Sequence, residues 1–402
     1  AYYYYYLYYY IILIYNIKKG KKKKHSGAKM EFTIEKELLS TNLKIVEKTT
    51  VARGIQPVLS NILIEASEDN FIKFSATDLD INIVSKTVAS VKESGKITLP
   101  AKKLSEIASK ISNKPVTFVL DAATNVVNIS CGNAKFELIG ISADEFPAIT
   151  TEEEIKDKEC TEIELNPLLK SIKHTAFSAA NYENRNIISG VFCQISKDNL
   201  EMAATDGNRL TRIIEKIQNG SESEISCVIP SKTLQEFLRI AALLDDESVG
   251  LIIEKTKIIF KTSGMIMTSR LLEGEYPPYK QLIPQTCEKN AVINREEMIE
   301  ALERVSVMVN ERTNIVKFIF GENTLFLKAD TPDAGLGEDS INAEYSDEEL
   351  TIAFNYRYVL DSLKIMDSEK IKIGLGGSLS ATLFRPDSED DYLCLIMPIQ
   401  IR

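Results

Sequence analysis

The sequence has few of the side-chain groupings on which enzymes depend. It contains two histidines, and only His174 lies outside the first 29 residues. It has no H-E-x-x-H pair, no Gly-rich phosphate loop followed by Lys and no G-x-S-x-G elbow. These absences leave no motif for a zinc hydrolase, a P-loop nucleotide hydrolase or an α/β-hydrolase. A lone histidine on a predicted helix is more often structural or solvated than catalytic, and we expect this of His174.

Two further motifs resemble a phosphate-binding loop and a calcium site, but each lacks other residues that such a site needs. Residues 374–377 are Gly-Leu-Gly-Gly, yet no helix and no Lys follow, so we predict a tight turn between strands. The acidic pairs Asp78 with Asp80 and Asp390 with Asp391 have no additional oxygen ligands at the spacing of a calcium loop. We therefore expect solvated turn residues there, with no bound metal and no cofactor.

Cysteine pairs and long apolar runs are also missing. The six cysteines form no C-x-x-C pair, which is typical of reduced thiols in a cytoplasmic protein. Residues 1–15 are almost entirely Tyr, Ile and Leu, and residues 18–24 are a basic run. The apolar run is shorter than the ~20 residues that cross a bilayer, and a signal peptide would place its charges first. We expect residues 1–29 to be translated non-coding or expression-derived sequence before a natural start at Met30; the alternative is a tether at a membrane surface.

The charge is acidic overall and basic in places. The formal net charge is −10, and residues 1–29 hold seven Lys and no acid, so the remainder carries −17. That sign alone argues against nucleic acid as a partner, because non-specific binding depends on Lys and Arg. Many cations nevertheless fall on predicted helices, and helices that shared one face would hold phosphates without distinguishing bases. Glutamates on the same helices leave ordinary solvated faces as the alternative.

The sequence repeats one pattern of short phrases three times. The phrases are Ala76-Thr77-Asp78, Ala204-Thr205-Asp206-Gly207 and Lys328-Ala329-Asp330-Thr331, with 128 and 124 positions between their aspartates. A second landmark recurs at residues 99–104, 229–234 and 354–359. Repeats of this length are whole domains, since solenoid repeats are usually about 20 to 50 residues long. We predict domains at residues 30–150, 158–282 and 288–402, with polar linkers at 150–158 and 284–290.

Each copy has the same predicted order of elements. In the first, Leu39, Leu43 and Val46 fall on one face of a helix that should end near Arg53-Gly54. Alternating strands follow, then a second helix over about 101–112 and more strands. The later copies repeat this order, with helices predicted over 166–176, 231–244, 295–309 and 356–366. The fold class is therefore α+β, with paired helices on one side of antiparallel sheets.

Five phrases resemble those of a known family. They are residues 53–64 (Arg-Gly-Ile-Gln-Pro-Val-Leu-Ser-Asn-Ile-Leu-Ile), 76–79, 204–210, 269–277 (Ser-Arg-Leu-Leu-Glu-Gly-Glu-Tyr-Pro) and 397–399. In these phrases, and along residues 30–402, the chain resembles the bacterial sliding clamp, the beta subunit of DNA polymerase III. The resemblance implies three domains of the DNA clamp fold and a head-to-tail homodimer closed into a ring. Helices would line the hole, and double-stranded DNA would pass through it irrespective of sequence.

The resemblance also implies a function without catalysis. Such a clamp is a processivity factor that tethers the DNA polymerase III alpha subunit, the clamp loader delta subunit, and other polymerases and repair proteins. These partners carry short peptides of the Gln-Leu-x-Leu-Phe kind, which bind a groove between the second and third domains. The residues implied for the groove are Ile188, Thr205, Gly207, Asn208, Arg209, Leu210, Pro230, Leu234, Asn355, Tyr358, Leu379, Leu395, Ile396, Met397, Pro398 and Ile399.

Apolar side chains and a flexible Met suit such a groove, and Arg209 would add a charge-assisted hydrogen bond. Two departures concern its rim: Asn208 stands where some members have His, and residues 400–402 are Gln-Ile-Arg where a basic residue and then Leu are common.

Two other surfaces follow from the same resemblance. The dimer contact would use Phe136 and Leu138 of the first domain, with Leu271 as a further candidate. DNA contact is expected at Arg53, Lys102 and Lys173. Two other classes of protein remain as alternatives: a three-domain binding protein held at a membrane by residues 1–29, and an enzyme that uses Asp206 or His174.

Overall fold

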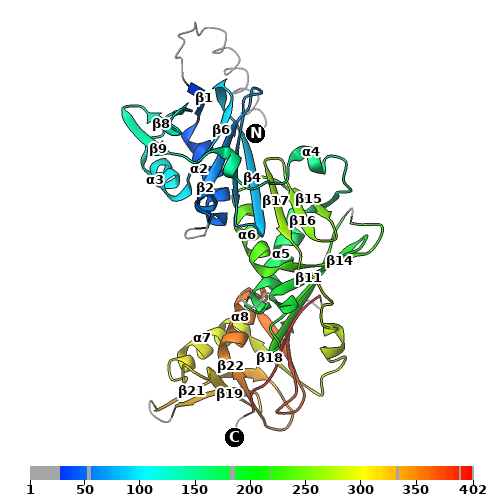
Figure 1. The fold of residues 1–402 in the computed structure, drawn as a ribbon. Coiled ribbons are helices and arrows are strands. Elements are labelled where there is room, and N and C mark those ends of the chain that lie inside the picture. Colours follow the sequence, from blue (N-terminus) through cyan, green and yellow to red (C-terminus); the bar gives the residue numbers. More distant parts are fainter. Residues whose placement is uncertain are drawn as a thin grey trace. The chain divides into compact units, whose positions relative to one another are not determined.

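The computed structural model of the chain describes residues 28–51, 56–181, 186–218, 220–331, 335–388 and 391–400. The chain falls into two compact units (Figure 1). The first consists of Ala1–Lys158 with Ile259–Ser269, and the second of Glu159–Ile258 with Arg270–Arg402. No helix of the described residues is both long and apolar enough to cross a bilayer.

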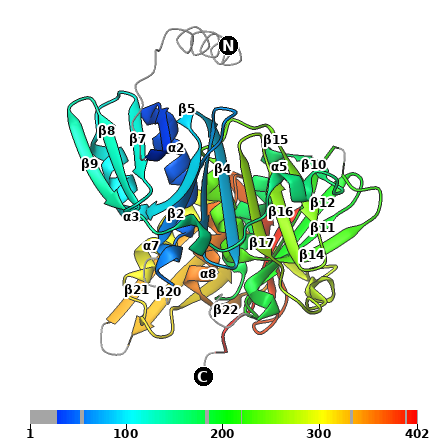
Figure 2. The ribbon, with the colours of Figure 1, turned by 45° about the horizontal axis from the view of Figure 1, so that its top comes forward.

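The first unit holds the first copy of the repeat. Its five-stranded sheet has the order β5-β1-β7-β8-β9, and β6, β2, β3 and β4 lie side by side in a second sheet. In Figure 2, β9 ends the first of these sheets. The elements are α2 (Lys36–Val46), α3 (Ala101–Lys110), α4 (Glu152–Ile155), β1 (Ala28–Ile34), β2 (Asn61–Ala66), β3 (Phe71–Thr77), β4 (Ile81–Val88), β5 (Ser90–Glu93), β6 (Gly95–Pro100), β7 (Val116–Asp121), β8 (Val126–Cys131) and β9 (Ala134–Ile139).

Helix α2 forms for the reason that its sequence pattern indicates. Leu39, Leu43 and Val46 are buried, whereas Lys44 is exposed. The helix ends at Val46 and passes into a 3-10 turn, η1 (Glu47–Thr49), so the prediction that it continues to Arg53-Gly54 is wrong. Thr50 causes the stop, because its hydroxyl and its backbone N–H both donate to the carbonyl oxygen of Glu47, at 2.7 and 3.0 Å.

The second unit holds the other two copies. The elements of the central copy are α5 (Leu165–Thr175), α6 (Ser231–Ala241), β10 (Thr161–Glu164), β11 (Gly190–Ile195), β12 (Asn199–Thr205), β13 (Arg209–Lys216), β14 (Ile225–Pro230), β15 (Ser248–Ile253), β16 (Lys257–Lys261) and β17 (Met265–Arg270). Most residues of β16 and β17 fall in the first unit, and the other elements fall in the second. Those of the third copy are α7 (Arg295–Ser306), α8 (Tyr356–Ile365), β18 (Lys289–Asn294), β19 (Ile315–Gly321), β20 (Thr324–Thr331), β21 (Gly335–Glu344), β22 (Leu350–Asn355), β23 (Lys370–Leu375), β24 (Thr382–Pro386) and β25 (Tyr392–Ile396).

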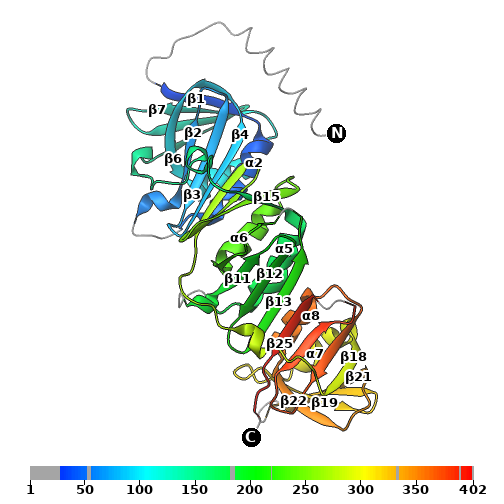
Figure 3. The ribbon, with the colours of Figure 1, turned by 90° about the vertical axis from the view of Figure 1, so that its right-hand side faces the viewer.

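A continuous sheet runs through both copies of the second unit. Its strand order is β14-β11-β12-β13-β25-β24-β23-β18-β21-β20-β19-β22. Figure 3 shows the central strands of this series, β11 to β13, continuing into β25. Helix α5 packs on β12 and β13, α6 packs on β11 and β14, and α7 packs on α8. The predicted layer of paired helices on antiparallel sheets is therefore confirmed.

Helix starts were predicted more accurately than helix ends. Asn294 caps α7 at the predicted start of this helix, since its side chain accepts from the backbone N–H of Glu297 at 3.1 Å. Both α6 and α7 are three residues shorter at their ends than the sequence suggested. There the chain changes to i→i+3 hydrogen bonds, for example from Leu244 N to Ala241 O and from Val309 N to Ser306 O.

The repeated Thr-Asp phrase is a turn with a defined hydrogen-bond pattern. In the central copy, Thr205 Oγ1 accepts from the N–H of Gly207, and Asp206 Oδ1 accepts from the N–H groups of Asn208 and Arg209. The first copy makes the same three bonds: Thr77 Oγ1 accepts from the N–H of Leu79, and Asp78 Oδ1 accepts from the N–H groups of Asp80 and Ile81. The residue after the Asp has a positive φ in both, +90° for Gly207 and 77° for Leu79. Asp78 is thus a turn residue, as expected.

The segments between the copies are more structured than polar linkers need be. Thr151 caps α4 inside the stretch predicted as the first linker. β18 begins at Lys289, inside the second. β17, which was predicted within the central domain, pairs antiparallel with β4, and Met267 lies opposite Ile83. Neighbouring copies are therefore connected by strand pairing as well as by chain. The turn predicted at the Gly-Leu-Gly-Gly stretch begins only at its second half: Gly374 and Leu375 still belong to β23, and Gly376 and Gly377 lead into the turn before β24.

Candidate peptide-binding groove and its surroundings

The second and third copies join edge to edge through β13 and β25. These strands run antiparallel, with Arg209 opposite Ile396 and Leu210 opposite Leu395. Directly opposed residues of such a pair point to the same face of the sheet. The junction, which we call the seam, therefore has one face toward helices α5 and α8 and another toward the segment that contains Tyr279.

Helices of both copies bind the first face of the seam. Cys394 Sγ lies 2.9 Å from Ser362 Oγ of α8. Opposite it, Thr211 Oγ1 donates to the carbonyl oxygen of Thr175 in α5 at 3.5 Å. Burial raises the pKa of the Cys394 thiol to about 12, so this thiol stays protonated at neutral pH. The face is a closed core and offers no surface to a ligand.

His174 is part of the same closed face. Its ring lies edge-on to Tyr392 of β25, with centroids 4.8 Å apart. Nδ1 is 2.8 Å from the carbonyl oxygen of Lys170, so Nδ1 carries the hydrogen and donates it. The residue is only 4% exposed, and burial lowers its pKa. His174 is therefore structural, as the sequence suggested.

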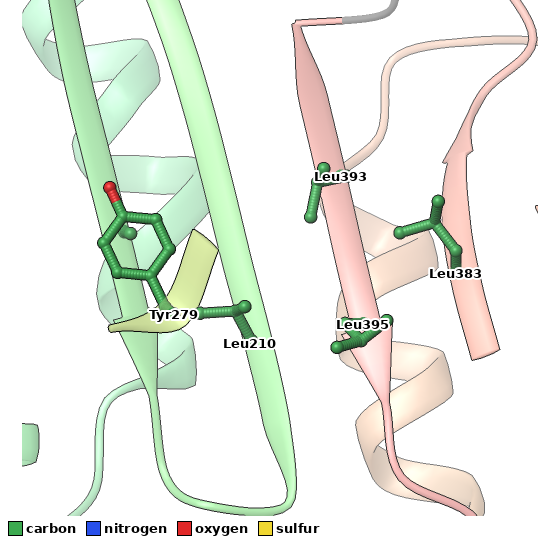
Figure 4. Close-up of a cluster of buried hydrophobic side chains, with 6 residues drawn as sticks. Leu210, Tyr279, Leu383, Leu393 and Leu395 are labelled. Atoms are coloured by element: carbon green, nitrogen blue, oxygen red, sulfur yellow. The ribbon is translucent and has the colours of Figure 1, made fainter. Parts of the chain in front are cut away.

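The second face of the seam is a hydrophobic cluster (Figure 4). Figure 4 shows Leu210 on one strand and Leu383, Leu393 and Leu395 on two others, with Tyr279 beside Leu210. The cluster draws these residues and Ala203 from β12, β13, β24, β25 and the 3-10 turn η7 (Tyr279–Leu282). Burying each leucine contributes about 1.5 to 3 kcal/mol, which makes the seam a firm base for a surface site.

One buried carboxylate fastens η7 to the sheet. Glu201 of β12 accepts hydrogen bonds from Arg212 Nε at 2.8 Å, from the Tyr279 hydroxyl at 2.7 Å and from Lys280 Nζ at 2.9 Å. Burial acts to raise the pKa of Glu201, but these three donors outweigh it and the pKa is lowered overall. The carboxylate is therefore ionised at neutral pH and holds the segment after the central copy against the seam.

Arg209 joins both copies at the end of the seam. Nε donates to Asp206 Oδ2 at 3.2 Å, Nη1 to Asp361 Oδ2 of α8 at 2.8 Å, and Nη2 to the carbonyl oxygen of Phe177 at 2.8 Å. The guanidinium also lies over the rings of Phe177 and Tyr358, at 5.2 and 4.5 Å from their centroids. All three nitrogens are thus engaged, and the side chain is 9% exposed. These bonds use three of the five N–H groups of the guanidinium, and a hydrogen bond from Arg209 to a bound peptide stays a prediction.

The other predicted groove residues divide by exposure. Exposed or partly exposed are Ile188, Gly207, Asn208, Asn355, Tyr358, Leu379, Met397, Pro398 and Ile399. Buried are Thr205, Leu210, Pro230, Leu234, Leu395 and Ile396. The buried ones contribute mainly to the core beneath the surface, and the first group offers most of the surface available to a ligand.

The exposed group includes large apolar side chains close to the seam. Met397 is 45% exposed, and its backbone N–H donates to the carbonyl oxygen of Asn208 at 2.8 Å. Leu379, in the turn between β23 and β24, is 58% exposed. Ile399 donates from its backbone to Ala353 O at 2.8 Å, which holds the chain after β25 against β22. The segment after β25 is therefore held by backbone bonds while its side chains remain available.

Sequence reasoning missed three residues that shape this region. Asp361 and Phe177 hold Arg209 in place, and nothing in their sequence surroundings marks them. The third, Tyr276, donates from its hydroxyl to Gly190 O at 3.4 Å and accepts from Thr205 N at 3.2 Å. Burial raises the pKa of Tyr276. Its position in the Glu-Tyr-Pro phrase at the end of the central copy was the available signal.

Comparison with known proteins identifies the family. Family models of the DNA polymerase III beta subunit match the N-terminal domain at residues 30–150, the central domain at 162–278 and the C-terminal domain at 280–400. The chain belongs to the bacterial beta sliding clamp family. Its relatives include the beta sliding clamps of Synechococcus elongatus, 32% identical over 93% of this chain and 100% of that protein, and Bacillus subtilis, 31% identical over 92% and 100%.

Solved structures of sliding clamps have the same fold. The Bacillus subtilis DNA polymerase sliding clamp superposes with a TM-score of 0.86 at 30% identity, covering 93% of this chain and 100% of that one. A Pseudomonas aeruginosa sliding clamp bound to griselimycin gives 0.85 at 26% identity, over 94% and 100%. The predicted arrangement of three clamp domains, each with helices on antiparallel sheets, is thereby confirmed.

Two strand edges of this clamp-family chain carry exposed apolar side chains. β9 ends its sheet; Ile139 is 76% exposed, and Phe136 and Leu138 are partly exposed. In the third copy, the part of β21 before Ala343 pairs only with β20 among the described residues. Leu336 on this stretch is 50% exposed, and Val307 just after α7 is 80% exposed.

The predicted contact residue Leu271 lies elsewhere. It follows β17, is partly exposed, and donates from its backbone to the carbonyl oxygen of Thr256 at 2.9 Å. Its role in a dimer stays a prediction. Val307 and Leu336 were not anticipated, because an exposed apolar residue cannot be distinguished from a buried one by its identity alone.

The cations of the helices are only partly available. Lys102 of α3 and Lys173 of α5 are exposed, and Arg53 lies outside the described residues. Many others pair with acids on the same or a neighbouring element: Lys103 with Glu106, Lys170 with Glu215, Arg239 with Glu236, Arg304 with Glu300 and Asp339, and Lys364 with Glu303. Part of the helical charge is thus neutralised locally.

No candidate metal centre appears in the part of the chain that the structure describes, where no group of three or more His, Cys, Asp or Glu residues is suitably placed. Asp80 lies in the turn described above, and Asp390 is outside the described residues.

Proposed function

We propose that two copies of this chain close head to tail into a ring around duplex DNA and serve as a sliding clamp. In this role the protein adds no bond-making chemistry. It holds the DNA polymerase III alpha subunit, the clamp loader delta subunit, and other polymerases and repair proteins near the DNA by binding their peptides. Membership of the beta sliding clamp family is the observation that carries the proposal.

Ring closure would pair β9 of one protomer with the open stretch of β21 in the other. An unpaired edge leaves backbone N–H and C=O groups available to another strand, and natural proteins usually protect such edges with charge or proline. β9 carries the exposed charges Lys135 and Glu137, but it also presents Ile139 at 76% exposure. Leu336 and Val307 offer an apolar counterpart on the third copy. The full chain is therefore expected as a dimer of about 90 kDa, twice the 45.1 kDa chain.

A matched pair of variants tests ring closure. Ile139→Glu places a charge on the β9 edge and should convert the dimer to a monomer in sedimentation equilibrium. Leu282→Glu changes a residue that is also exposed, at 59%, but belongs to η7 and to neither edge strand, and it should stay dimeric. A wild-type chain that is a stable monomer at micromolar concentration would refute the ring.

Peptide capture is assigned to the exposed group at the seam. A Gln-Leu-x-Leu-Phe peptide would place its Leu and Phe side chains against Met397, Pro398 and Leu379. Met side chains adapt to varied partners, which suits a site that receives several peptides. Arg209 would keep the two copies in register beneath this surface.

Fluorescence anisotropy with a labelled Gln-Leu-x-Leu-Phe peptide tests the groove. Met397→Ala combined with Pro398→Ala should abolish measurable binding and leave the dimer intact. Phe326→Ala is the control, since Phe326 is 48% exposed on β20, on the third copy but away from β25. Unchanged peptide affinity in the double variant would rule out this location.

Topological retention tests the function as a whole. Clamps loaded onto a closed circular duplex should stay bound after transfer to high salt, which weakens phosphate contacts, whereas clamps on a linear duplex should slide off its ends. Equal release from both forms would mean that the protein does not encircle DNA.

A further inference from the structure

Two of the six cysteines face each other on neighbouring strands of the central copy. Cys193 of β11 lies directly opposite Cys227 of β14 in an antiparallel register. Opposed residues of such strands have Cα atoms about 4.5 to 5.5 Å apart and point to the same face. A disulfide requires a Cα separation of about 4.4 to 6.8 Å, so a disulfide can join these two residues without a shift of either strand. The register therefore places the two thiols next to each other on the same face of the sheet.

The two thiols differ in access to solvent. Cys193 is 1% exposed, whereas Cys227 is partly exposed. This difference follows from the topology, because β14 is the terminal strand of its sheet and β11 lies inside it. The hydrogen bond to Cys227 and burial both raise the pKa of Cys193, which keeps that residue a thiol at neutral pH. Cys227 is therefore the sulfur that a reagent in solution can reach first.

The other four cysteines are arranged differently. Cys131 lies opposite Ala134, and Cys394 lies opposite Thr211, so neither has a sulfur across its strand pair. Cys160 is exposed and outside any strand, and Cys287 is partly buried. These residues serve as internal controls, since they share the chain and the solvent but not the opposed geometry.

We propose that Cys193 and Cys227 are a redox-responsive pair, which a low-molecular-weight disulfide such as oxidised glutathione converts into a cross-strand disulfide. The Cys227 thiol loses its proton to water, and its sulfur attacks one sulfur of the oxidant. The oxidant's S–S bond breaks, and the departing half takes up a proton. Cys193 then loses its proton, attacks Cys227 Sγ and releases the second half as a thiol. Two protein thiols lose two electrons and two protons, and one small disulfide becomes two thiols.

The link would tie the edge of the central copy to its interior. β14 runs directly into α6, since Pro230 ends the strand and Ser231 begins the helix. A bond between Cys193 and Cys227 closes a loop of 34 residue steps, the difference between their numbers in the chain. Disulfides stabilise mainly by restricting the unfolded chain, and more so for longer loops. The oxidised protein is therefore expected to melt several degrees above the reduced protein.

Peptide mapping of the full chain tests the proposal. Trypsin releases residues 186–197 and 217–232 as separate peptides, each with a single cysteine. After incubation with oxidised glutathione at neutral pH and trapping of free thiols, these peptides should appear joined, at their summed mass less two hydrogen atoms. Dithiothreitol should separate them and lower the melting temperature again. Cys227→Ser should remove both effects, and Cys160→Ser should leave both unchanged.

Three results would overturn the proposal. The first is a glutathione adduct that remains on Cys227 without forming the joined peptides. The second is cross-linking dominated by Cys160 or Cys287. The third is a melting temperature that rises equally in Cys227→Ser. Because Cys193 is buried, its substitution could disturb folding; the wild-type map and the Cys227→Ser variant decide the question without it. The outcome does not depend on whether the protein acts as a clamp.

Discussion

Replacing Arg209 with Ala should loosen the seam between the second and third copies. Hydrogen bonds to charged groups contribute about 1.5 to 3 kcal/mol each, and Arg209 makes two in partly buried surroundings, to Asp206 and to the Phe177 carbonyl. The bond to Asp361 counts for about 1 kcal/mol at most, because that carboxylate is 48% exposed. With Asp206 left unpaired at 15% exposure, the total loss should be about 3 to 5 kcal/mol.

Hydrogen exchange read by mass spectrometry measures this loss where it occurs. If amides of β13 and β25 exchange by local opening, a loss of about 3 kcal/mol speeds their exchange roughly a hundredfold. Asp361→Asn removes only the exposed ion pair, so it should speed exchange by about fivefold or less. Arg209→Ala exchanging no faster than Asp361→Asn would refute the view that Arg209 holds the seam. If Arg209→Ala lowered only the affinity for the peptide, Arg209 would instead be assigned a contact with the bound peptide.

Three other expectations concern stability. Gly207→Ala should cost about 1 kcal/mol in urea unfolding, because Gly207 has φ +90° and no atom within 4 Å of an added Cβ, so strain acts alone. Glu201→Gln should cost about 2 kcal/mol at pH 7. Since the pKa of Glu201 is lowered below 4.5, that difference should vanish as acid protonates the wild type. The pKa of His174 is lowered below 6.5, so wild-type stability should fall as pH drops through 6.5, and His174→Gln should weaken that fall.

Local patterns predicted the helices well because their causes are local. The spacing of Leu39, Leu43 and Val46 gives a helix face whatever that face packs against, and all three are buried. The Asn294 cap likewise depends on a backbone N–H three residues away. Helix ends were less accurate because a stop such as that at Thr50 depends on one side chain competing for one carbonyl.

The seam and the strands that join the copies needed information that a single sequence does not carry. Alternation assigns a residue to a face of a strand, but it does not say which strand lies beside it. Arg209 and Asp361 are 152 positions apart, and nothing near either one indicates the other. The resemblance named Leu234 and Ile396 for the groove, yet both have no exposed surface. Motif matching selects residues that shape a site, and only coordinates separate those that touch a ligand from those beneath it.

Strand pairing between copies has a consequence for how the chain assembles. Two pairings join strands of different copies, since β17 pairs with β4 and β13 pairs with β25. Each of these junctions pairs strand edges that would otherwise be open to other chains. The two apolar strand edges differ in form, since β9 is a complete terminal strand and the open part of β21 belongs to a longer strand. Because the two edges differ, β9 of one chain is expected to pair with β21 of the other, rather than β9 with β9 or β21 with β21. This head-to-tail pairing is the arrangement that a ring of two chains requires.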